Sequence, residues 1–149
     1  MIPLLLALAA QSSALDWAEF SRAAALSHVR ETVEVRTARS EAPNRMEYEL
    51  IYMRESLHTK EIFSTTSVAC PAVRTVIVSM RALPMPRPAP YGVEGDSGEL
   101  VLDGTTYTLS VPTDFTAGRM AISSNVDSPL AIWVDGAFTA LKPCWMKVG

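Results

Sequence analysis

Two cysteines, Cys70 and Cys144, place the strongest constraint on how this chain folds. In an oxidising compartment, an even pair of cysteines in a small protein normally forms a disulfide. A zinc site would need two further ligands, and neither His28 nor His58 stands at a ligand spacing from either cysteine. The sequence therefore predicts a Cys70–Cys144 disulfide that fastens the end of the chain to its middle. Two separate buried thiols are the alternative.

The first fourteen residues are typical of a secretory signal peptide. The apolar run over residues 4–10 is shorter than the roughly 20 residues that span a bilayer, and Ser12-Ser13-Ala14 places small residues where a signal peptidase reads them. No Lys or Arg precedes this run, so the alternative is an N-terminal helix that packs on the core. We predict cleavage after Ala14, export to a bacterial periplasm or outside the cell, and no transmembrane segment.

Residues 15–149 have the length and composition of a single globular domain. Of the whole chain, 48% is hydrophobic and 19% is charged, which provides enough apolar material for a core. The 13 Lys and Arg residues are outnumbered by 16 Asp and Glu residues, and they form no basic stripe. Nucleic-acid binding is therefore not predicted, because it draws on clustered positive charge.

Alternation of apolar and polar residues predicts strands over residues 29–37, 46–52 and 120–123. Residues 44–61 are ambiguous because Leu50, Met53 and Leu57 also have helical spacing, but the β-branched run that follows favours a strand. Residues 73–83, rich in Val and Ile, are the clearest predicted strand. Residues 100–109 predict a hairpin about Asp103-Gly104, a turn in which Leu100 would face Tyr107.

The two ends of the domain predict helices. Asp16 and Glu19 stand at capping positions of an Ala-rich stretch that ends at Ser27, which favours a short helix. Near the other end, Ser128 and Pro129 are typical of a helix cap and first turn. An apolar stripe at helical spacing follows them: Leu130, Trp133, Val134, Ala137, Phe138 and Leu141. Prolines at every second position make residues 83–92 an internal loop.

These elements predict an α+β fold. We expect an antiparallel, meander-like sheet of five to seven strands, with the C-terminal helix packed on one face. The short N-terminal helix and the proline-rich loop would complete the domain.

Two motifs invite a chemical interpretation, and in both we favour a structural one. Gly95-Asp96-Ser97-Gly98 resembles the nucleophile segment of chymotrypsin-like serine proteases, but the likeness ends at Glu99, where that family has Gly. Turn chemistry explains four such residues, so we predict that Ser97 is structural. Glu55, His58 and Glu61 would share a face only on a helix, so we expect His58 to be exposed rather than a metal ligand.

The second half of the chain is acidic, and its acidic residues include Glu94, Asp96, Glu99 and Asp103. These four are the candidate contact residues for a protein partner. The leading hypothesis is a non-catalytic exported domain that binds a partner or serves the cell envelope, without a cofactor. The alternatives are a small hydrolase that uses a pair of carboxylates, and an inhibitor or immunity protein with an acidic binding face.

Overall fold

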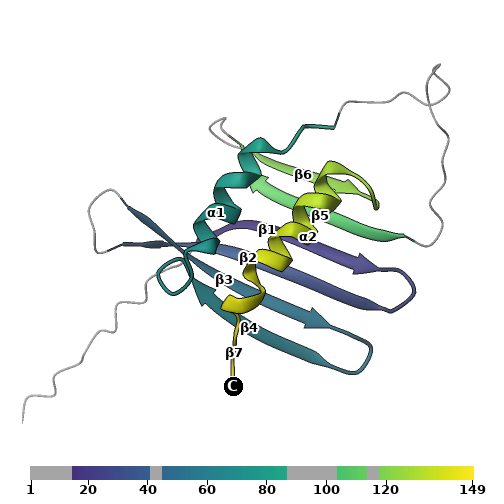
Figure 1. Ribbon diagram of the computed structural model, residues 1–149, viewed down its shortest axis with the longest axis horizontal. Helices are drawn as coiled ribbons and strands as arrows, with labels where there is room; N and C mark the ends of the chain where they lie inside the picture. The colour runs from purple at the N-terminus through teal and green to yellow at the C-terminus, as the bar shows by residue number, and fades with distance from the viewer. Residues whose placement is uncertain (1–14, 41–44, 87–103, 114–117) are drawn as a thin grey trace, which may run out of the picture.

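In the part of the chain that the structure describes, seven strands pair into one antiparallel sheet in the order β6-β5-β1-β2-β3-β4-β7 (Figure 1). The computed structural model describes residues 15–40, 45–86, 104–113 and 118–149. The strands are β1 (Leu15–Ala24), β2 (Val29–Arg39), β3 (Met46–Glu55), β4 (Lys60–Thr66), β5 (Thr105–Pro112), β6 (Arg119–Ser124) and β7 (Met146–Lys147). Strands β1 to β4 form a meander, and β5 returns to pair with the free side of β1. The predicted α+β fold and antiparallel sheet are confirmed.

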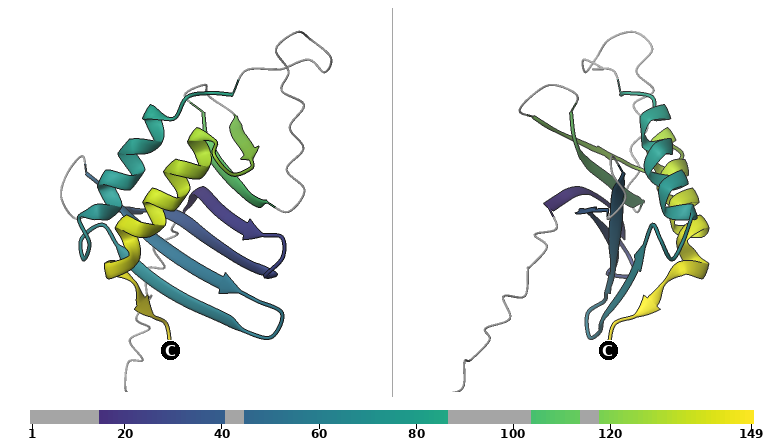
Figure 2. Two further views of the ribbon diagram at one scale, coloured as in Figure 1. Left: turned by 45° about the vertical axis from the view of Figure 1, so that its right-hand side comes forward. Right: turned by 90° about the vertical axis from the view of Figure 1, so that its left-hand side faces the viewer.

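The two α-helices among the described residues pack side by side on the same face of the sheet (Figures 1 and 2). Helix α1 (Ala72–Ser79) continues into the 3-10 turn η1 (Met80–Ala82), and α2 (Pro129–Leu141) continues into η2 (Lys142–Cys144). The side chain of Ser128 accepts a hydrogen bond from the backbone N–H of Ala131 at 3.0 Å, and Pro129 opens the helix. The predicted C-terminal helix and its cap are therefore confirmed.

The core lies between the sheet and the helices. Phe20 on β1 is fully buried and lies opposite Val33 of β2 and Leu109 of β5. Its ring meets the rings of Trp133 and Phe138 of α2 edge-on, with centroids 5.2 and 5.7 Å apart. This geometry is favourable for aromatic pairs beyond the area they bury. The apolar stripe of α2 thus faces the central strands.

The predicted N-terminal helix is wrong, because residues 15–24 form β1. This strand pairs with β2 on one side and β5 on the other, so its backbone groups are satisfied along both edges. Its side chains alternate accordingly: Ala18 and Phe20 are buried in the core, whereas Glu19 between them points to the other face. Tertiary pairing has overridden the helical preference of the Ala-rich sequence.

The predicted strand over residues 73–83 is also wrong, because this segment forms α1 and η1. Val73, Val76 and Ile77 are the buried residues of α1 and follow helical spacing. Their β-branched side chains lower helix propensity only slightly, and burial against the sheet outweighs that cost. The strand expected over residues 46–52 is confirmed as β3, which resolves the ambiguity of residues 44–61.

Of the remaining predictions, some are confirmed, one is wrong and the others are untested. Cys70 and Cys144 form the predicted disulfide, with Cα atoms 5.8 Å apart, and β6 confirms the strand at residues 120–123. Tyr107 lies opposite Arg22 and Ser124, so its predicted pairing with Leu100 is wrong. The signal peptide, most of the proline-rich loop and the first arm of the hairpin lie outside the described residues.

Candidate functional site

The acidic residues singled out from the sequence, Glu94, Asp96, Glu99 and Asp103, lie outside the described residues, and so does Ser97. The structure therefore leaves the predicted acidic contact surface untested.

The two histidines lie in exposed turns, His28 between β1 and β2 and His58 between β3 and β4. Glu55 binds Lys60 at 2.6 Å, and Glu61 binds Lys147 at 3.1 Å, so both acids beside His58 are paired with lysines. Within the described residues, no group of three or more His, Cys, Asp or Glu side chains is placed to hold a metal ion. No helix in that part of the chain is long and apolar enough to cross a membrane.

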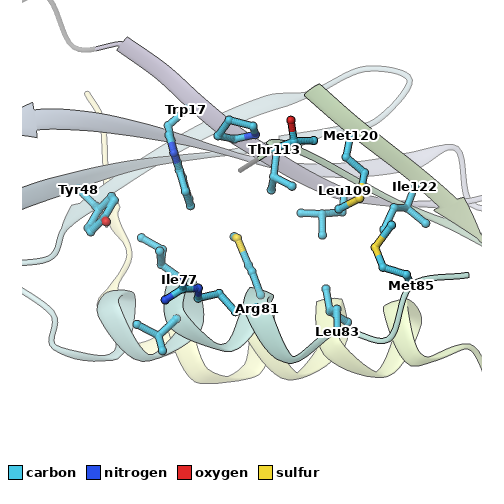
Figure 3. A pocket seen from close by; sticks show the side chains of 14 residues that line it. Trp17, Tyr48, Ile77, Arg81, Leu83, Met85, Leu109, Thr113, Met120 and Ile122 are labelled. Atoms are coloured by element: carbon cyan, nitrogen blue, oxygen red, sulfur yellow. The ribbon is translucent and has the colours of Figure 1, made fainter. Parts of the chain in front are cut away.

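A cavity of about 800 Å³ lies between the sheet and the segment that runs from α1 through η1 to Met85 (Figure 3). Its sheet side is formed mainly by residues of four strands: Trp17, Tyr48, Leu109, Val111, Met120 and Ile122. Its helix side is formed mainly by Ile77, Met80, Arg81, Leu83 and Met85. The lining is predominantly apolar. The volume of the cavity falls within the range of roughly 300–1,000 Å³ that is usual for small-molecule sites.

The two ends of the cavity differ in chemistry. Trp17 and Tyr48 form an aromatic end, with ring centroids 5.9 Å apart and planes inclined at 54°. Met85, Met120 and Ile122 lie at the opposite end (Figure 3). Methionine is flexible and polarisable, so it adapts to the outline of an apolar molecule. The cavity therefore offers a rigid aromatic wall at one end and an adaptable aliphatic wall at the other.

Arg81 is the charged residue among the described side chains that line the cavity. It belongs to η1, is exposed, and extends toward the end of the cavity formed by Trp17 and Tyr48 (Figure 3). It makes no ion pair or hydrogen bond with any described residue. By contrast, Arg22 and Arg74 are each held by a carboxylate 2.6 Å away. Arg81 thus presents a guanidinium without a partner among the described residues at the mouth of an apolar space.

A separate polar network joins α2 to the sheet. Arg22 donates from Nε to Glu31 at 2.6 Å and from Nη1 to Asp135 at 2.7 Å. The hydroxyl of Tyr52 donates to Glu31 at 2.6 Å, and the hydroxyl of Tyr107 donates to Asp135 at 2.9 Å. Each carboxylate therefore accepts one bond from the shared arginine and one from a tyrosine. Five elements of the fold are tied together at this point: the strands β1, β2, β3 and β5 and the helix α2.

The protonation states of this network follow from its contacts. Burial alone would raise the pKa of Glu31, but the hydrogen bonds from Arg22 and Tyr52 outweigh it and lower the pKa. Burial and the bond to Glu31 raise the pKa of Tyr52 well above its ordinary value, and burial with the bond to Asp135 raises that of Tyr107. Glu31 is thus held ionised, the opposite of what a carboxyl general acid needs.

The residues of the cavity carry little signal in the sequence. They come from β1, β3, α1, η1, β5 and β6 and from the residues that follow η1 and β5, and the methionines among them are not regularly spaced. Scattered methionines are more simply read as gap-filling core residues. Only the assembled sheet and helix bring Arg81 to the same cavity as Trp17 and Tyr48, so the sequence pattern does not reveal the site.

Comparison of the chain with models of protein families, with curated proteins and with solved structures found no match.

Proposed function

We propose that this protein is an exported, non-catalytic binding protein that holds a small apolar molecule in the cavity between η1 and the sheet. The observation that carries the proposal is the cavity of about 800 Å³ with its aromatic and methionine walls. Burying apolar surface of a ligand against such walls provides most of the free energy of binding for molecules of this class. If water alone filled a space of this size, the apolar side chains that line it would remain hydrated, which is unfavourable in free energy.

The contacts of the titratable groups favour binding over acid–base chemistry. The paired carboxylates Glu31 and Asp135 are occupied by Arg22 and the two tyrosine hydroxyls, outside the cavity. The described lining contains apolar side chains, Pro112, Thr113 and Arg81, and no described carboxylate, imidazole or thiol. A hydrolase built on a carboxylate pair would need such groups to face its substrate.

Export is the part of the proposal that rests on the sequence and on the cysteines. The signal-like residues 1–14 precede β1, and the Cys70–Cys144 disulfide favours an oxidising compartment. Binding of a protein partner by the acidic residues Glu94, Asp96, Glu99 and Asp103 remains a separate prediction.

A neutral apolar probe tests the binding function. N-phenyl-1-naphthylamine, whose fluorescence rises in apolar surroundings, should bind the purified protein saturably at about one molecule per chain. Val111→Trp places a large ring in the cavity and should weaken this binding about tenfold, a difference of about 1.4 kcal/mol. Val148→Trp, the same change at an exposed position near the C-terminus, should leave it unchanged.

The proposal is contradicted in two ways. One is the absence of saturable binding by the folded wild-type protein. The other is equal binding by Val111→Trp and Val148→Trp, once circular dichroism has shown that both variants are folded.

A further inference from the structure

We propose that the cavity selects a linear amphiphile with a carboxylate head, which Arg81 binds while the alkyl chain extends toward Met85 and Met120. This inference deepens the proposed binding function and rests on it. It adds the class of ligand, the residue that recognises its head and the direction in which its tail lies.

The position of Arg81 provides the first argument. An arginine that lines an otherwise apolar cavity and has no described partner leaves its N–H donors for a bound group. The guanidinium fork matches a carboxylate and can donate two parallel hydrogen bonds to it. One arginine balances one negative charge, which fits a monoanion better than a group of higher charge. Because Arg81 is exposed, the head of the ligand would lie at the mouth of the cavity.

The shape of the apolar space provides the second argument. A smaller cavity of about 140 Å³ shares Leu83, Met85 and Ile122 with the larger one. It continues past them to Ser124 and Leu130, near the beginning of α2. The two cavities are therefore neighbours that share part of their lining, and they lie one after the other from the aromatic end, past the methionines, to the first turn of α2. A flexible chain fits such a space better than a compact ring system does.

The same geometry predicts a dependence on chain length. Each methylene group that enters apolar surroundings is expected to strengthen binding about fourfold. This gain should continue while the tail has room in the smaller cavity. Ile122 belongs to both cavities, so Ile122→Trp should end the gain at a shorter chain.

Displacement of the neutral probe by two ligands of equal length tests the role of Arg81. Laurate and 1-dodecanol have the same number of carbons and differ in the charge of the head. The wild-type protein should bind laurate about fivefold more tightly than dodecanol, as expected of an ion pair near the surface. Arg81→Gln should remove this preference and still bind the neutral probe. Arg30→Gln, which removes a positive charge from β2 away from the cavity, should keep the preference.

The outcomes separate the two proposals. Equal affinity for laurate and dodecanol in the wild type, or a preference that survives in Arg81→Gln, would overturn the assignment of Arg81 and leave the binding function standing. Absence of saturable neutral-probe binding to the folded wild-type protein would instead overturn the binding function itself.

Discussion

Arg22 on β1 and Asp135 on α2, far apart in sequence, form an ion pair of 2.7 Å that anchors the helix to an interior strand of the sheet. The same guanidinium binds Glu31 of β2 at 2.6 Å and lies over the ring of Phe138, with its Cζ atom 4.5 Å from the centroid. Charge, hydrogen bonds and a cation–π contact therefore act on one side chain. The middle of α2 is fixed by polar contacts, whereas the cavity lies on the apolar side of α1.

The ionised state of Glu31 makes part of the stability depend on pH. Its pKa is lower in the folded protein than in the unfolded chain, so the stability it contributes is present above its ordinary pKa and is lost as the pH falls through the folded value. Glu31→Gln should lower the free energy of unfolding by about 1–3 kcal/mol at neutral pH. The difference from the wild type should shrink between about pH 5 and about pH 3.

Urea unfolding at several pH values measures this difference. Glu19→Gln, on the opposite face of the sheet, is the matched control and should follow the wild type throughout. A difference between wild type and Glu31→Gln that stays constant across the acid range would contradict the assigned role of Glu31.

A side-chain hydrogen bond joins the two helices. The indole N–H of Trp133 donates to Oγ of Ser79 at 2.8 Å, and Ser79 in turn donates to the carbonyl of Val76 at 2.7 Å. Ser79→Ala leaves a partly buried indole N–H without its acceptor, which should cost about 1–2 kcal/mol of unfolding free energy. In a double-mutant cycle with Trp133→Phe, the coupling should be about 1 kcal/mol. Additive effects of the two substitutions would show that the bond contributes nothing.

The disulfide should contribute strongly to stability. It joins the turn before α1 to the end of η2, so it holds the first helix and the C-terminal segment together. Chain entropy sets an upper figure of about 4–5 kcal/mol for a loop of this length. Reduction should therefore shift the urea midpoint of the wild type to lower concentration, and it should not affect the Cys70→Ser/Cys144→Ser variant. Identical midpoints for oxidised and reduced wild type would contradict this role.

Export predicts a defined N-terminus. When the chain is produced in a bacterium with a periplasm, N-terminal sequencing of the exported protein should begin at Leu15. A charge within the apolar run, as in Leu6→Arg, should keep the protein in the cytoplasm. Leu26→Arg, at an exposed leucine in the turn after β1, should be exported normally. Exported protein that retains Met1 would refute the signal peptide.

The sequence predicts those parts of the fold in which local pattern and tertiary pairing agree. Strands β2 and β3 alternate clearly, and α2 combines the cap at Ser128 with an apolar stripe, so both kinds of element are predicted correctly. In β1 and α1 the two signals conflict. The capping residues and alanines of β1 favour a helix, but pairing with β5 makes this segment a strand. The valines of α1 favour a strand, but burial of residues such as Val76 at helical spacing makes it a helix.

The candidate site is less predictable than the fold for a different reason. The disulfide depends on two residues whose chemistry is evident from their type, and it is predicted correctly. The cavity depends on where α1 and η1 lie over the sheet, and the sequence predicts a strand for that segment. With that segment assigned as a strand, nothing in the sequence places Arg81 at the cavity, so no pattern identifies it as a binding residue.

The methionine methyl groups provide the most direct test of the binding cavity. Met80, Met85 and Met120 line the cavity, whereas Met46, Met53 and Met146 do not, so the chain contains its own control set. In the NMR spectrum of protein labelled at the methionine methyls, N-phenyl-1-naphthylamine should shift the resonances of the first three and leave those of the second three in place. Shifts confined to Met46, Met53 and Met146, or no shift at all, would contradict a binding site between η1 and the sheet.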